Sequence, residues 1–164
     1  MKNLGKQFEQ NFRKSIPESE NIYYYRLKDS ASSYYGGNDS LRFSQSNIAD
    51  AFMFYVNEYV NLLLILEFKH HKGKSLPINC IRENQLKEMM LATKKRDVVP
   101  MLIVFFSDVE KCYSLSIEDV YNYINNTDRK SIPLEYFEQC ATPIEVTKLR
   151  TNYTFNIKDW LNNI

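Results

Sequence analysis

The 164-residue chain lacks the features of a membrane-spanning or secreted protein. Its longest apolar run is about half of the ~20 residues that a bilayer-spanning helix needs. Its first 14 residues contain no apolar stretch of the kind found in secretory signal peptides. We therefore expect a cytoplasmic protein with no membrane partner.

Excess charge of one sign is also absent, because the formal net charge is only +1. Composition alone therefore does not indicate nucleic-acid binding, and any basic surface has to be local. Cysteine is scarce as well: Cys80, Cys112 and Cys140 are widely spaced and form no C-x-x-C pair. This spacing favours free thiols over a zinc site or a disulfide framework.

Hydrophobic and aromatic residues, in contrast, are plentiful. The chain is 44% hydrophobic and carries 12 Tyr and 10 Phe, while 25% of its residues are charged. Such a composition is typical of a folded globular protein, and the length suits one domain. We expect residues 1–164 to form a single domain.

Periodicity and turn residues predict an alternation of helices and strands. The expected strands cover residues 21–27, 48–55, 61–69, 98–106 and 111–117. The expected helices cover residues 4–16, 81–96, 116–126, 133–140 and 156–163. Residues 75–80 read as a loop. This order predicts an α/β fold, in which a mixed β-sheet is flanked by helices.

Residues 28–46 interrupt this order with a stretch rich in Ser, Gly, Asn and Tyr. Loops of this length inside a compact domain are usually functional or mobile. We expect a flap or a projecting hairpin, a stalk, at about 28–46. Tyr34 and Tyr35 could stack on unpaired bases there, or they could simply pack within the loop.

Three charged side chains are expected to meet where the strand over 61–69 ends. If the preceding hairpin turn is centred between Glu58 and Tyr59, Asp50 lies opposite Glu67. Side chains alternate along a strand, so Glu67 and Lys69 share one face. Two carboxylates this close repel each other unless a proton or a cation lies between them.

Mg²⁺ would relieve that repulsion, because it prefers oxygen ligands and needs only one or two carboxylates beside its waters. Asp50, Glu67 and the backbone carbonyl of Phe68 are the predicted metal ligands. Lys69 could orient a water or stabilise negative charge on a phosphate. The non-catalytic alternative is that Glu67 and Lys69 form a surface ion pair at a strand end.

An aspartate followed by Glu-x-Lys on the next strand resembles the motif of the PD-(D/E)XK nucleases. The resemblance implies a restriction-endonuclease-like fold and phosphodiester hydrolysis. Glu9, on the first helix, and Gln85, on the helix after the motif, are candidate supporting members of the catalytic set. Gln85 is expected to face inward, where its amide needs a partner.

More narrowly, the chain resembles the RecU-type Holliday junction resolvases. The resemblance runs from about Gly5 to Leu161 and is carried by "GKQFEQNF", "RFSQSNIADAF", "LLILEFKHHKGKSLPI", "ENQLKEMM", "PMLIVFF", "KSIPLEYFEQC" and "TFNIKDWL". It implies a homodimer that binds four-way DNA junctions and cuts two opposed strands with Mg²⁺, with Mn²⁺ as an alternative. It also implies a role in recombination and repair, and recombinase binding to which no residue is assigned. The short chain suggests a phage version, acting in the host cytoplasm.

Positively charged residues around these motifs are candidates for phosphate contacts, which would add salt-dependent affinity. They are Arg13, Lys14, Arg26, Arg42, Lys72 and Lys74. A solvated surface is the alternative for each. Other functions also stay open: an endonuclease for other branched or duplex DNA, a non-catalytic recombination accessory, or an interaction domain with an accidental Glu-x-Lys.

Overall fold

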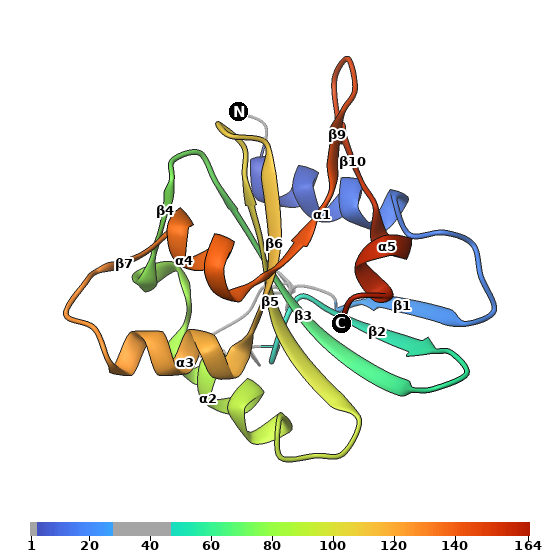
Figure 1. The fold of residues 1–164 in the computed structure, drawn as a ribbon, viewed down its shortest axis with the longest axis horizontal. Coiled ribbons are helices and arrows are strands. Elements are labelled where there is room, and N and C mark those ends of the chain that lie inside the picture. The colour runs from blue at the N-terminus through green and yellow to red at the C-terminus, as the bar shows by residue number, and fades with distance from the viewer. Residues whose placement is uncertain (1–2, 28–46) are drawn as a thin grey trace, which may run out of the picture.

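The computed structural model describes residues 3–27 and 47–164, and within them six strands form one mixed sheet (Figure 1). The strand order is β1-β2-β3-β5-β6-β8. Neighbouring strands are antiparallel, except that β3 and β5 run parallel. The bounds are β1 Ile22–Arg26, β2 Ala51–Val56, β3 Asn61–His71, β5 Val98–Phe106, β6 Lys111–Ser116 and β8 Thr142–Ile144. The predicted restriction-endonuclease-like α/β fold is confirmed.

Helices cover both faces of this sheet. On one face lie α1 (Leu4–Lys14) and α5 (Ile157–Leu161), whose Phe8, Phe12 and Trp160 pack into one buried cluster with alternate residues of β2, β3 and β5. On the other face lie α2 (Glu83–Ala92), α3 (Ile117–Asn125) and α4 (Leu134–Cys140), around a second cluster. This arrangement follows from the two-residue period of the strands, which sends neighbouring side chains to opposite faces.

The parallel pair in the centre of the sheet is connected through α2. Parallel strands need a crossover connection, and a helix usually provides it. Residues 100–106 of β5 are all buried, which explains their continuous apolar run. This crossover brings the start of α2 to the end of β3, where the predicted charged side chains lie.

Two short antiparallel pairs complete the fold. β4 (Ser75–Pro77) pairs with β7 (Ser131–Pro133), and β9 (Val146–Lys148) pairs with β10 (Tyr153–Phe155). The prediction of a loop over 75–80 is therefore wrong, because β4 is followed directly by a 3-10 helix, η1 (Ile78–Cys80). Across residues 3–27 and 47–164, no helix is both long and apolar enough to cross a bilayer.

Candidate active site

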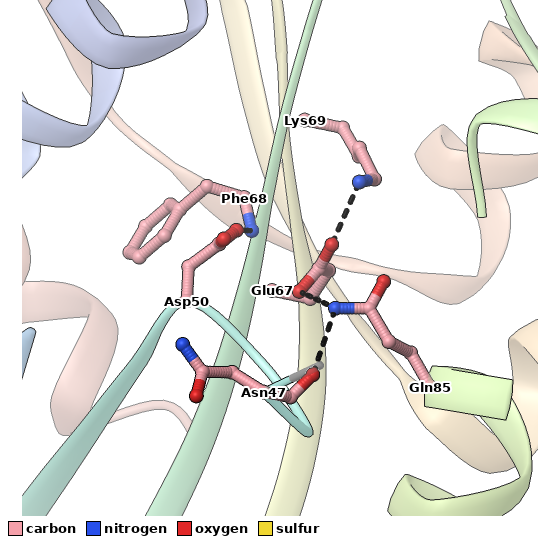
Figure 2. Close-up of polar contacts among 6 residues, drawn as sticks. All are labelled: Asn47, Asp50, Glu67, Phe68, Lys69 and Gln85. Carbon is pink, nitrogen blue, oxygen red and sulfur yellow. Dashed lines mark hydrogen bonds and ion pairs between the residues drawn. The ribbon is translucent and has the colours of Figure 1, made fainter. Parts of the chain in front are cut away.

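A buried carboxylate lies near the end of the central strand β3. Glu67 is only 4% exposed, and both of its carboxylate oxygens accept hydrogen bonds (Figure 2). Lys69 Nζ donates to Oε1 at 2.7 Å, and Gln85 Nε2 donates to Oε2 at 3.3 Å. The same Gln85 nitrogen donates to the backbone carbonyl of Asn47 at 3.3 Å. Gln85 thus faces inward as predicted, and it connects α2 to the chain just before β2.

Asp50 is held firmly between two strands although it precedes β2. Its amide donates to the Leu66 carbonyl at 3.0 Å, and its own carbonyl accepts from the Leu27 amide at 2.8 Å. Its carboxylate turns back toward β3, where Oδ2 accepts from the Phe68 amide at 2.8 Å (Figure 2). A side chain fixed at both backbone and carboxylate is well ordered for binding.

The hairpin register is the one predicted from the turn position. Ala51 pairs with Leu66, and each further pair of β2 and β3 keeps that register. The ladder ends at Ala51, so Asp50 does not pair with Glu67. Beyond this point β2 no longer provides backbone acceptors for β3. The Asp50 carboxylate accepts the hydrogen bond from the Phe68 amide instead, so this amide is not left without an acceptor.

Both carboxylates border one pocket of about 440 Å³. Its charged and amide residues come from four parts of the fold: Glu9, Asn47, Asp50, Glu67, Lys69, Arg82 and Gln85. Glu9 belongs to α1 and Gln85 to α2, so helices from opposite faces of the sheet meet where β2 begins. The residues predicted to be catalytic are thereby brought together.

Burial and the charges around Glu67 shift the pKa of its carboxyl group. Desolvation, and then the nearby negative charge of Asp50, raise the pKa of Glu67 from 4.5 to about 7. The cations Lys69 and Arg82 oppose this rise. A divalent cation between the two carboxylates would favour the ionised form of both, because an opposite charge at close range lowers the pKa of a carboxyl group.

The donor set of this pocket suits a hard metal ion. Within residues 3–27 and 47–164, no group of three or more His, Cys, Asp or Glu side chains is placed to hold a metal. Mg²⁺ does not need such a group, because it keeps several waters and is bound through one or two carboxylates. The residues Asp50 and Glu67 supply two, so the donor set fits the predicted ion.

The Phe68 carbonyl can add a further oxygen. The Leu66 carbonyl and the Phe68 amide both point toward Asp50. In a strand, the amide and the carbonyl of one residue point to the same side. The Phe68 carbonyl therefore lies at the edge of β3 that β2 no longer covers.

Glu9 has a salt-bridge partner in the structure. Its Oε2 accepts from Arg26 Nε at 2.9 Å, and both side chains are partly buried. This bond connects α1 to the end of β1, beside the pocket. Arg26 was predicted as a DNA contact. Its salt bridge to Glu9, which lines the pocket, holds it close to the site.

The other predicted DNA contacts lie at several places. Arg13 and Lys14 are exposed at the end of α1, and Lys72 and Lys74 are exposed in the turn between β3 and β4. Tyr34, Tyr35 and Arg42 lie outside the described residues, as does the predicted stalk over 28–46.

Sequence reasoning missed two polar residues that line the pocket, Asn47 and Arg82. Asn47 acts through its backbone carbonyl, which no residue-type pattern can reveal. Arg82 has a weak signal: it lies three residues before Gln85, at the start of a helix already assigned to the site. Residues one helical turn apart lie on the same side of a helix, so Arg82 could have been considered a site residue once Gln85 was expected to face inward.

Comparisons with known proteins agree with this geometry. The sequence model of the family "Recombination protein U" (RecU) matches residues 41–159. The chain is 27% identical over 168 residues to the SPbeta prophage-derived uncharacterized protein YotM of Bacillus subtilis (strain 168), covering 93% of this chain and 82% of that protein. It is 26% identical over 120 residues to the Holliday junction resolvase RecU of Ureaplasma parvum serovar 3 (strain ATCC 700970), covering 73% of this chain and 65% of that protein.

Proposed function

The chain belongs to the RecU family, and we propose that it is a Mg²⁺-dependent endonuclease that resolves four-way DNA junctions by paired nicks. The observation that carries this proposal is the pair of carboxylates, Asp50 and Glu67, that border one pocket beside Lys69. The similarity to the Ureaplasma parvum resolvase supports the choice of substrate. The similarity to a prophage-derived protein supports a phage version, which would act in the host cytoplasm.

In this proposal Asp50, Glu67 and the Phe68 carbonyl hold the ion. When bound, Mg²⁺ would offset the negative charge that develops on the attacked phosphate, and Mn²⁺ could replace it. The chain itself prepares the ligands. The Phe68 amide orients the Asp50 carboxylate, and Gln85 orients that of Glu67. Ligands fixed by such neighbours lose little freedom when they bind.

Lys69 acts on the water and the phosphate. Its ammonium donates to Glu67 at the pocket wall, so it is already close to the reacting groups. From there it orients the attacking water and stabilises negative charge on the phosphate. Glu9 supports the site from the α1 side, where its carboxylate can hold waters of the ion or of a second ion.

Two symmetric nicks in one junction call for two copies of the site. A homodimer with a two-fold axis provides them, as in most symmetric assemblies of soluble proteins. Exposed cations at Arg13, Lys14, Lys72 and Lys74 would contact phosphates outside the pocket. A recombinase remains a proposed partner to which no residue is assigned.

A cleavage assay tests this function. Labelled four-way junction, flap and linear duplex are incubated with Mg²⁺ or with chelator, using wild type, Asp50→Asn, Lys69→Ala and the control Asp128→Asn. Asp128 is exposed and does not line the pocket. We expect paired nicks on the junction with Mg²⁺ only, and a loss of at least about 10²-fold for both site variants but not for the control.

Each other outcome identifies a different function. Equal cutting of flap or duplex would indicate a nuclease of broader substrate range, and binding without cutting would indicate a recombination accessory. Cutting that survives both site substitutions would mean that the site is elsewhere. On a cruciform plasmid, paired nicks within one encounter give linear product, whereas independent nicks give open circles.

A further inference from the structure

Among the described residues, one cation of the pocket has no carboxylate partner. Lys69 and Arg82 both line the pocket, but Lys69 is bonded to Glu67. No hydrogen bond or ion pair engages the Arg82 guanidinium anywhere in residues 3–27 and 47–164. Arg82 is exposed, so its charge is available to a ligand that enters the pocket.

Arg82 shares its pocket with the two carboxylates. It lines that pocket together with Asp50 and Glu67, and it lies three residues before Gln85, whose amide donates to Glu67. The guanidinium is therefore placed to contact an anion that approaches the two carboxylates.

The backbone around Arg82 strengthens the positive potential. Arg82 immediately precedes α2, and its side chain does not cap the helix. In the described part of the chain, the amides of Glu83, Asn84 and Gln85 find no acceptor, since the first bonded amide is that of Leu86. Free amides and the helix dipole make a helix start attractive to phosphate.

We propose that Arg82 binds a phosphate of the DNA strand that is cleaved. Its guanidinium would donate hydrogen bonds to the non-bridging oxygens of that phosphate, beside Asp50 and Glu67. This inference rests on the proposed nuclease function and adds a substrate-binding residue to the same site. A guanidinium suits the role, because its planar fork can donate two parallel hydrogen bonds to one phosphate. The substrate then supplies the negative charge that Arg82 does not find in residues 3–27 and 47–164.

Binding without cleavage tests this role first. Anisotropy of a labelled four-way junction is measured with chelator over a range of salt, for wild type, Arg82→Ala, Arg82→Lys and the control Arg96→Ala. Arg96 lies beyond the other end of α2, is 94% exposed and pairs with Asp97. We expect Arg82→Ala to weaken binding by about 3–10-fold and to reduce the salt slope by about 1. The control should stay within about twofold of wild type.

Cleavage rates then distinguish the contribution of the positive charge of Arg82 from that of its planar guanidinium. In single-turnover experiments at saturating protein, Arg82→Ala should cut about 10-fold more slowly or worse, and Arg82→Lys should be intermediate. Melting curves of the variants should match wild type, because the side chain is exposed.

Two outcomes would overturn these ideas separately. If Arg82→Ala binds and cuts junctions as the Arg96→Ala control does, the role of Arg82 is wrong while the nuclease function stands. If wild type neither binds nor cuts any DNA, the proposed function fails and the role of Arg82 fails with it.

Discussion

At the scale of single residues, Glu67 is the only buried charged side chain in residues 3–27 and 47–164. A carboxylate that is 4% exposed loses most of its hydration, and such a loss is tolerated only with partners. Lys69 and Gln85 provide hydrogen bonds, but Asp50 adds a second negative charge. Stability is therefore given up at this position, as is common where function requires a charged pocket.

This conflict predicts a pH dependence of stability in the absence of metal. The pKa of Glu67 is raised from 4.5 to about 7 on folding, so the folded state binds the proton more tightly than the unfolded state. Its contribution to the free energy of unfolding is complete below pH 4.5 and is lost as the pH rises through 7. Between pH 5 and pH 8, wild type should lose about 2–3 kcal/mol more than Glu67→Gln.

Urea unfolding with chelator at several pH values measures this difference. Glu88→Gln, an exposed substitution on α2, is the matched control and should follow wild type. His70, whose pKa burial lowers, is present in every variant, so its titration cancels. Parallel curves for wild type and Glu67→Gln would show that Glu67 titrates as in an unfolded chain.

Residue types and spacing predicted which charged side chains lie together at the candidate site, but not all the residues around them. Asp50, Glu67 and Lys69 could be found because a short hairpin and strand alternation fix which side chains meet. The Asp50 to Phe68 hydrogen bond could not, because it arises only where the ladder stops. Arg82 was missed because its place depends on how α2 packs, which sequence spacing does not determine.

At the scale of elements, α1 is held by an aromatic cluster that also supports β3. Phe12 is fully buried, and its ring lies 4.9 Å from that of Phe68 and 5.8 Å from that of Trp160. Phe68 is the residue between Glu67 and Lys69, so the same packing steadies the strand that carries the site.

Phe12→Ala should therefore destabilise the protein by about 3–5 kcal/mol, since it removes a large buried ring. Leu4→Ala, on the same helix but 39% exposed, should cost far less. Chemical denaturation of the two variants measures the contrast. Equal losses would mean that α1 contributes through its helix alone and not through the buried cluster.

Long elements were predictable and short ones were not. The helices and the five long strands follow clear periodicity, and their ends differ from prediction by a few residues. The strands that were not predicted, β4, β7, β8, β9 and β10, have three residues each. β4 depends on a partner more than fifty residues away, so local propensity could not reveal it. β2 starts at Ala51 instead of 48 because residues 48–50 bend before the strand.

At the scale of the whole molecule, the fold brings opposite faces of the sheet to one pocket. α1 delivers Glu9 from one face, α2 delivers Gln85 from the other, and the ends of β1 and β3 lie between them. Such a site needs the complete domain, so it is sensitive to packing far from the chemistry. Because the net charge is only +1, the proposed DNA binding depends on local cations such as those around this pocket.

The most direct test of this account is a crystal structure of the full chain after soaking with Mn²⁺, whose anomalous scattering locates the ion. We predict one ion bound directly by an oxygen of Asp50 and an oxygen of Glu67. The same crystals of Asp50→Asn should lack it. An ion bound elsewhere by protein that cuts junctions, with both carboxylates free of metal, would contradict the account.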